Sequence, residues 1–300
     1  MYEQAGASLE KLREEAISTA IERAREKVQL SYEQSSNPED RLSFHNSTHT
    51  NDVIRRIELI VNTIKTAEPA LVTPQVADRA KIAGAFHDTV QNWTPKEDKG
   101  RVMRNRAVGK NEKASGNLAA EYLAEANRKS RQEIFTSEDA RVIREAIDAT
   151  VPGWNPALGT VVQPNVEAES TLVARVLALA DINGAGIDGG AAYLRDSDIL
   201  FREENLDIAR AFGQSDAISP EAQAAFRERM LAWERGQVVF AEGRKSAFGQ
   251  EIKVFSEPIQ EQLRILFNKF DESIHMQKER LAKRTEMSFG ELAEDMGYQS

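Results

Sequence analysis

Apolar residues recur at spacings of three and four along most of this chain, and this periodicity limits how it can fold more than any other feature. Residues 8–30 place leucine, isoleucine, valine and alanine at these spacings between charged residues, and residues 46–66 repeat the pattern. Such spacing puts the apolar side chains on one face of a helix. Similar patterns occur at residues 74–86, 111–128, 137–150, 167–184, 220–235, 257–284 and 288–296. We therefore predict an all-α fold.

Signals for strands and for flexible linkers are few. The best strand candidate is the weak one at Gln237–Phe240. Residues 31–43 are polar and are predicted to form a connector, while the proline and glycine content of residues 92–110 and 151–166 predicts two loops. None of these segments resembles a linker between domains, so we expect one helical body.

Composition and charge exclude several classes of protein. The 300 residues include no cysteine, which rules out disulfides, thiolate metal sites and thiol nucleophiles. The 48 acidic and 39 basic side chains give a net charge of -9, which argues against binding a nucleic-acid polymer. No apolar signal segment opens the chain, and the longest apolar stretch, Leu172–Ile182, is far shorter than the ~18 residues that span a membrane. We expect a soluble, cytoplasmic protein without membrane contact.

Three of the four histidines lie in two short segments. His45 and His49 are four residues apart, which places them on one face of a helix. His87 and Asp88 are adjacent, so they diverge by about 100° around a helix and reach a single ion only from its side. Imidazole and carboxylate together suit Mn, Fe, Co, Ni or Zn. Each pair taken alone is common by chance, but together, on helices with apolar faces, they indicate a metal site. His275 is not part of such a pair and is predicted to be a surface or packing residue.

Four segments of the chain resemble the HD superfamily of metal-dependent phosphohydrolases. Phe44–Val53 (FHNSTHTNDV) looks like the aromatic-His-Asn-x-x-His-x-x-Asp-Val segment of cyclic-nucleotide phosphodiesterases, and Ala83–Asp88 (AGAFHD) matches the His-Asp helix. Asn111–Gly116 (NEKASG) resembles the Asn-Glu-x-x-Ser-Ala segment of predicted bacterial HD phosphohydrolases, and Leu177–Asp181 (LALAD) supplies a distant aspartate. The resemblance covers roughly residues 40–205.

The resemblance implies a fold, a division of the chain and a set of metal ligands. It implies an HD-like helical core over residues 40–205, preceded by a helix and connector over 1–39 and followed by a helical extension over 206–300. This extension is expected either to cover the site or to form an interface in a homo-oligomer. The implied metal ligands are His49, His87, Asp88 and Asp181, and His45 is implied to be the acid that protonates the leaving oxygen.

Local reasoning leaves some of these roles open. Asp181 could simply be a carboxylate at a helix end, although a carboxylate that ends an apolar stretch is costly to bury unless it is paired or coordinated. Glu112 is a candidate to orient or deprotonate a water, or else a carboxylate that favours the N-terminal end of a helix. No histidine lies between Asp88 and Asp181, whereas HD proteins that hold two metals tightly usually place histidines there. We therefore expect one protein-held divalent ion (Mn, Fe, Co, Ni, Zn or Mg), with any second ion kept mainly by water and Asp88.

The segment after the His-Asp pair is locally basic in an acidic protein. Residues 92–113 contain seven basic side chains against three acidic ones. A phosphorylated substrate near the metal would favour such a charge, with Arg104 and Arg106 as the first candidates, although a charged run is more often a solvated loop. Trp93 could stack on a base or serve packing.

Two functions remain open from the sequence. The first is a metal-dependent phosphohydrolase that cleaves a phosphomonoester or phosphodiester, with a nucleotide among the candidate substrates. The second is an HD-fold regulatory or ligand-binding module with little or no turnover. The complete set of implied ligands favours the enzyme.

Overall fold

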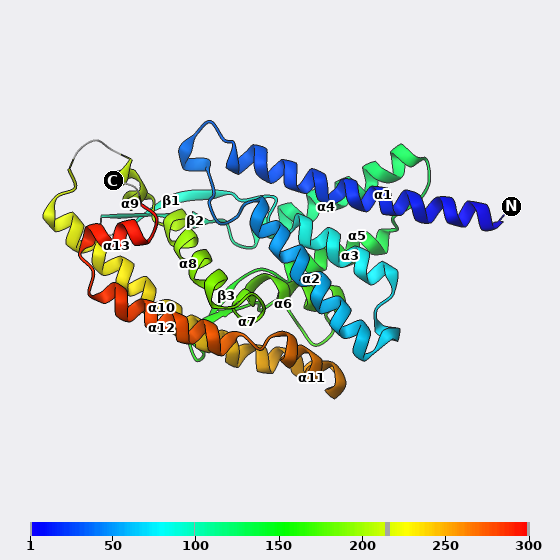
Figure 1. Ribbon diagram of the computed structural model, residues 1–300. Coiled ribbons are helices and arrows are strands. Elements are labelled where there is room, and N and C mark those ends of the chain that lie inside the picture. Colours follow the sequence, from blue (N-terminus) through cyan, green and yellow to red (C-terminus); the bar gives the residue numbers. More distant parts are fainter. Residues whose placement is uncertain (1, 99, 214–216, 299–300) are drawn as a thin grey trace.

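The computed structural model describes residues 2–98, 100–213 and 217–298 and is helical almost throughout (Figure 1). The prediction of an all-α fold is confirmed. The helices are α1 (Tyr2–Val28), α2 (Ser47–Ala67), α3 (Pro74–Phe86), α4 (Lys110–Ser130), α5 (Ser137–Asp148), α6 (Leu172–Ile182), α7 (Gly184–Ile187), α8 (Gly190–Glu204), α9 (Leu206–Phe212), α10 (Pro220–Glu251), α11 (Glu257–Leu266), α12 (Phe270–Thr285) and α13 (Phe289–Asp295). Two short antiparallel hairpins join them: β1 (Trp93–Asp98) with β2 (Arg101–Arg106), and β3 (Gly153–Asn155) with β4 (Thr160–Val162).

The most apolar helix, α6, lies at the centre of the fold. It packs against α2, α3 and α5. Seven of the eight residues from Val173 to Ala180 are buried. A helix that is apolar around most of its circumference must be covered on all sides. The neighbouring helices supply that cover with one apolar face each, and α1 and α4 lie outside them. The arrangement brings the C-terminal end of α6 to the interior of the molecule, where Asp181 lies.

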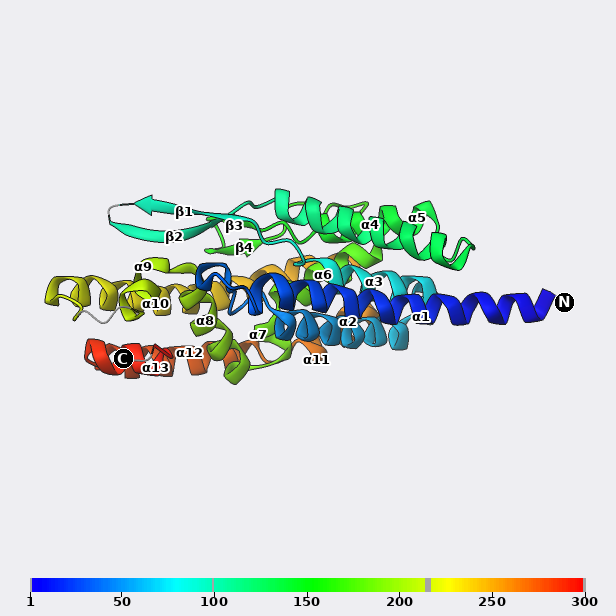
Figure 2. The ribbon, with the colours of Figure 1, turned by 90° about the horizontal axis from the view of Figure 1, so that it is seen from above.

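The molecule is elongated, with the start of α1 projecting at one end and α13 lying at the other (Figure 2). The predicted extension over residues 206–300 forms α9 to α13, and α10 and α12 run side by side along one edge (Figure 1). Ile259 and Leu263 of α11 belong to the same buried cluster as the α2 side chains. The C-terminal helices therefore share the core rather than forming a separate one throughout.

An ionic network joins α8, α10 and α12. Glu234 of α10 is buried completely and accepts hydrogen bonds from Arg280 and Arg284 of α12 at 2.8–3.0 Å. The same two arginines donate to Asp198 of α8 at 2.6–2.9 Å. Because every charge in the network has an opposite partner, the network can be buried between three helices.

Several local expectations were wrong. Gln237–Phe240 is not a strand but part of α10, which continues to Glu251 instead of ending near residue 235. The helical segment predicted for residues 257–284 is divided into α11 and α12. The two predicted loops contain the β1–β2 and β3–β4 hairpins, and the predicted connector contains short helical turns at Gln29–Glu33 and Pro38–Asp40. Among the described residues, no helix combines the length and apolar character needed to cross a membrane.

Asp139 anchors α1 and α3 to α5. Its carboxylate, only 2% exposed, accepts hydrogen bonds from Arg79 at 2.7 Å and from Arg13 at 3.3 Å. It also caps its own helix by accepting from the backbone N–H of Thr136. Burial alone would raise its pKa, but these donors outweigh burial and lower the pKa of Asp139 to about 2.

We expect Asp139→Asn to destabilise the protein in a pH-dependent way. A carboxylate whose pKa is lower in the folded state stabilises that state above its unfolded pKa of about 4, and this contribution disappears as the pH falls toward 2. The substitution should therefore lower the free energy of unfolding at pH 7 by about 2 kcal/mol, with a smaller difference below pH 4. Urea unfolding at several pH values measures this. The exposed Glu133 provides the control, since Glu133→Gln should change little. An effect of Asp139→Asn that did not vary with pH would contradict this account.

Candidate metal centre and active site

His49 is positioned by the cap of α2. The side chain of Asn46 accepts hydrogen bonds from the backbone N–H groups of Thr48 and His49 at 2.8 and 3.0 Å, which is the usual role of asparagine at this position. His49 thus lies in the first turn of α2, with its imidazole buried. The segment that resembles the phosphodiesterase motif therefore has a local structural role as well, because its asparagine starts the helix.

His87 and Asp88 directly follow α3, which lies close against α2. Gly84 permits this approach, because an added Cβ would meet Cδ1 of Ile57 at 2.3 Å. Nδ1 of His87 donates to the backbone carbonyl of Gly84 at 2.7 Å, which leaves Nε2 as an acceptor directed at His49. Fixing one imidazole nitrogen so that the other can bind an ion is the common arrangement in metal sites.

Asp181, at the end of α6, completes a cluster with the two histidines. Nε2 of His49 and Nε2 of His87 are 3.4 Å apart, and Oδ1 of Asp181 lies 3.7 and 3.6 Å from them. Two ligands of one tetrahedral ion, each at ~2.1 Å, would be separated by about 3.4 Å. The three donor atoms are therefore spaced as ligands of a single ion would be. They come from parts of the chain that are far apart in sequence.

Asp88 approaches the same pair of imidazoles. Its Oδ2 lies 3.4 Å from Nε2 of His49 and 3.2 Å from Nε2 of His87. Its Oδ1 accepts a hydrogen bond from the side-chain amide of Gln91 at 2.7 Å, and Gln163 donates to Oδ2 of Asp181 at 3.2 Å. Both carboxylates are thus oriented by an amide partner, as ligating carboxylates usually are.

The charged groups of this cluster favour a cation between them. Burial lowers the pKa of His49, but Asp181 and Asp88 outweigh burial and raise it to about 9. The pKa of His87 is also raised, and that of Asp88 is lowered well below its usual value, mainly because the charge of His87 outweighs burial. Two carboxylates around two buried imidazoles favour positive charge at their centre. The donor set and its charge therefore both fit a divalent ion.

His45 lies beside the cluster with different partners. Its Nδ1 is hydrogen-bonded to Glu203 of α8, and its Nε2 accepts from Nη1 of Arg106 at 2.9 Å. Glu203 also accepts from the backbone N–H groups of Phe44 and His45. Burial raises the pKa of Glu203, but these contacts outweigh burial and lower it to about 2. Glu203 is therefore ionised and holds the imidazole in one orientation, with Nε2 directed away from it.

The remaining predicted residues have mixed placements. Arg106 and Glu112 line the cavity at the metal centre, although Oε2 of Glu112 also accepts from the N–H of Gly109 and caps α4. Arg104 is not among the described residues that line this cavity. It donates to the carbonyl of Glu203 at 2.7 Å and lies 4.3 Å from the ring centroid of Trp93. Arg104 thus fastens the β1–β2 hairpin to α8, and its guanidinium lies over the ring of Trp93.

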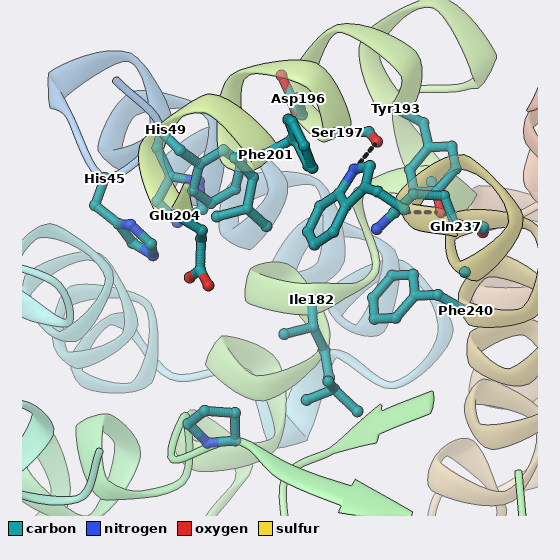
Figure 3. Close-up of a pocket in the computed structure, with 18 of the residues that line it drawn as sticks. His45, His49, Ile182, Tyr193, Asp196, Ser197, Phe201, Glu204, Gln237 and Phe240 are labelled. Carbon is teal, nitrogen blue, oxygen red and sulfur yellow. Dashed lines mark hydrogen bonds between the residues drawn. The ribbon is translucent and has the colours of Figure 1, made fainter. Parts of the chain in front are cut away.

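A cavity of about 610 Å³ opens from the candidate metal centre and extends along α8 and α10 (Figure 3). Its walls include His45, His49, Asp88 and Asp181 at one end and aromatic side chains of the two helices farther along. This volume lies within the usual range for small-molecule sites, which is roughly 300–1,000 Å³. The predicted C-terminal extension thus forms part of the site through α10.

Sequence reasoning missed Glu203 and the face that α10 presents to the cavity. Glu203 lies in the charged run Arg202–Glu204, which looks like any solvated helix face. The available signal was on α10, where Trp233, Gln237 and Phe240 recur at spacings of three and four. His275, by contrast, is where it was expected, on the surface beside Glu279. A comparison of the chain with protein-family models, with curated proteins and with solved structures found no match.

Proposed function

We propose that this protein is a metal-dependent phosphohydrolase of the HD type, which cleaves a phosphate ester with a metal-activated water. The observation that carries the proposal is the convergence of His49, His87, Asp88 and Asp181 at one end of a large cavity. These are the residues for which the resemblance implies ligand roles. The proposal includes the cytoplasmic location expected from the sequence.

The ion would supply an activated water and would offset charge on the phosphoryl group. His49, His87 and Asp181 would hold it, with Asp88, which approaches the same two imidazoles, as a further ligand. Gln91 and Gln163 would keep the two carboxylates in place during turnover. Mn, Fe, Co, Ni, Zn and Mg all remain candidates, because the chain offers nitrogen and oxygen donors but no sulfur ligand from cysteine.

His45 and Arg106 would act on the substrate itself. The hydrogen bond from Nδ1 to ionised Glu203 would hold the imidazole of His45 so that a proton on Nε2 could pass to the leaving oxygen. Arg106 donates to this same nitrogen in the absence of substrate. Once His45 carries a proton there, the guanidinium would be displaced from it and would be available to a phosphate oxygen.

Metal analysis followed by a substrate screen tests the proposal. We expect purified protein to contain about one divalent ion per chain and to hydrolyse generic phosphate esters such as nitrophenyl phosphate and bis-nitrophenyl phosphate. A chelator should abolish turnover, and added metal should restore it. Bound metal without turnover on any ester would contradict the enzyme and would instead support the regulatory or ligand-binding module.

A further inference from the structure

The cavity continues beyond the metal centre along two helices that do not contribute metal ligands. Side chains at spacings of three and four on α8 and α10 pack against each other and form one wall of it. This aromatic compartment is formed by Tyr193, Ser197 and Phe201 of α8 and by Trp233, Gly236 and Phe240 of α10. Its aromatic rings make it a surface that favours apolar ligand groups.

The aromatic compartment is long compared with a phosphate group. His45 and Glu204 lie at one side of the close-up, and Tyr193 and Phe240 lie at the other (Figure 3). From Tyr193 to Glu204, α8 rises about 16 Å. A substrate with its phosphate at the metal centre would therefore have room for an extended group along α8.

The polar atoms of the aromatic compartment are largely paired with one another. Nε1 of Trp233 donates to Oγ of Ser197 at 3.0 Å, and the hydroxyl of Tyr193 donates to the backbone and side-chain oxygens of Gln237 at 2.7 and 2.9 Å. Within the described part of the chain, the carboxamide nitrogen of Gln237 is left without such a partner. A nucleobase brings several donors and acceptors, and leaving them unpaired in a buried site is costly. The paired walls instead suit a hydrocarbon or a simple aryl group.

Gly236 lies in the middle of α10, where glycine is less favourable than alanine. It is exposed and lines the cavity. A Cβ added at Gly236 would meet no heavy atom of the described residues within 4 Å. Gly243 on the same helix differs, because its added Cβ would lie 2.4 Å from the carbonyl oxygen of Leu158. Packing thus explains the second glycine, whereas the first leaves open space at an exposed part of the cavity wall.

We propose that the substrate is a phosphate ester of an apolar alcohol, whose alkyl or aryl group lies in the aromatic compartment while its phosphate lies at the metal centre. This inference rests on the proposed function and adds the substrate class. It assigns selectivity to α8 and α10 and chemistry to α2, α3 and α6. Nucleoside phosphates, which share the phosphate but not the apolar group, should be poor substrates.

A series of alkyl phosphates measures the contribution of the aromatic compartment. Each buried methylene contributes about 0.8 kcal/mol, so kcat/KM should rise about two- to fourfold per methylene from ethyl to butyl to hexyl phosphate. Adenosine monophosphate should not exceed ethyl phosphate. Equal kcat/KM for ethyl and hexyl phosphate, or a preference for the nucleotide, would overturn the assignment.

Filling the space in front of Gly236 tests where the apolar group of the substrate binds. Gly236→Leu should reduce the ratio of kcat/KM for hexyl over ethyl phosphate about tenfold or more, since the leucine occupies the position of several methylenes. Gly249→Leu is the matched control, because Gly249 lies on the same helix, is exposed and also has nothing within 4 Å of its added Cβ. It should retain the wild-type ratio. Leucine has a higher helix propensity than glycine, so both variants should fold. Circular dichroism checks this. The same ratio in both variants would place the apolar group elsewhere.

A binding measurement separates this inference from the proposed function. Hexylphosphonate and ethylphosphonate, which cannot be hydrolysed, can be titrated calorimetrically into the metal-loaded protein. Tighter binding of hexylphosphonate that is lost in Gly236→Leu would support the aromatic compartment even if no ester were hydrolysed. Turnover of esters together with equal affinity for the two phosphonates would leave the phosphohydrolase in place and refute the substrate class.

Discussion

Replacing His87 with alanine should remove the bound metal and reduce phosphoesterase turnover by about 10³-fold or more, because the activated water depends on the ion. The imidazole is 1% exposed, and its Nε2 lies within 3.6 Å of carboxylate oxygens of both Asp88 and Asp181. Its removal leaves His49 as the one imidazole of the described residues near these two carboxylates. Elemental analysis of the purified variant measures the loss of metal directly. Asp88→Ala should also lose the metal and the turnover.

His275→Ala is the matched control for this experiment. His275 is the same residue type on the surface, with 72% of its side chain exposed and Glu279 as its ion-pair partner. This variant should keep both the metal and the activity. Circular dichroism should show wild-type helical content in both variants, since the helices are held mainly by apolar packing. Equal metal content in wild type, His87→Ala and Asp88→Ala would refute the metal centre.

Replacing His45 with alanine should separate the acid from the ligands. We expect this variant to keep its metal and to lose about 10²–10⁴-fold in turnover, the usual contribution of a general acid. The reason is that both imidazole nitrogens of His45 already have other partners, Glu203 at Nδ1 and Arg106 at Nε2. His49→Ala, one helical turn away, should instead lose the metal itself. Metal analysis and steady-state kinetics on the same preparations distinguish the two variants.

The leaving group provides an independent check on His45. Nitrophenyl esters need little protonation of the leaving oxygen, so the loss in His45→Ala should be smaller for them than for alkyl esters. A loss of the same size for both kinds of ester would assign His45 to orienting the substrate. Loss of metal in His45→Ala would make it a fifth ligand, and unchanged turnover would leave it with a structural role only.

The helices and the ligand pairs could be predicted because both depend on local patterns. Apolar spacing identifies a buried face wherever one side of a helix is solvated, and that holds for α2 and α5. His49, His87 and Asp88 were found because histidine is rare in this chain and three of the four occur in two short segments. Asp181 required the resemblance, since an acidic residue at the end of an apolar stretch has no distinctive local pattern.

Other features could not be predicted from the sequence because they depend on distant parts of the chain. Gln237–Phe240 has the β-branched and aromatic residues of a strand, but the helical spacing of Trp233 and Phe240 continues through it and tertiary packing selects the helix. Glu203 could not be distinguished from its charged neighbours until α8 was placed beside His45. The β1–β2 hairpin is polar at most positions, and its few apolar residues do not give the sustained alternation that identifies strands.

The ionic network of Glu234, Arg280, Arg284 and Asp198 has a consequence for the energetics of binding. It ties α8 and α10 to α12 on the side of these helices that does not line the cavity. Because charged partners fix the placement of the two helices, Trp233 is held against Phe201 and Tyr193 against Phe240, with ring centroids 5.6 and 6.5 Å apart. The wall that these side chains form would thus be pre-organised, and a substrate bound against it would spend no affinity on ordering it.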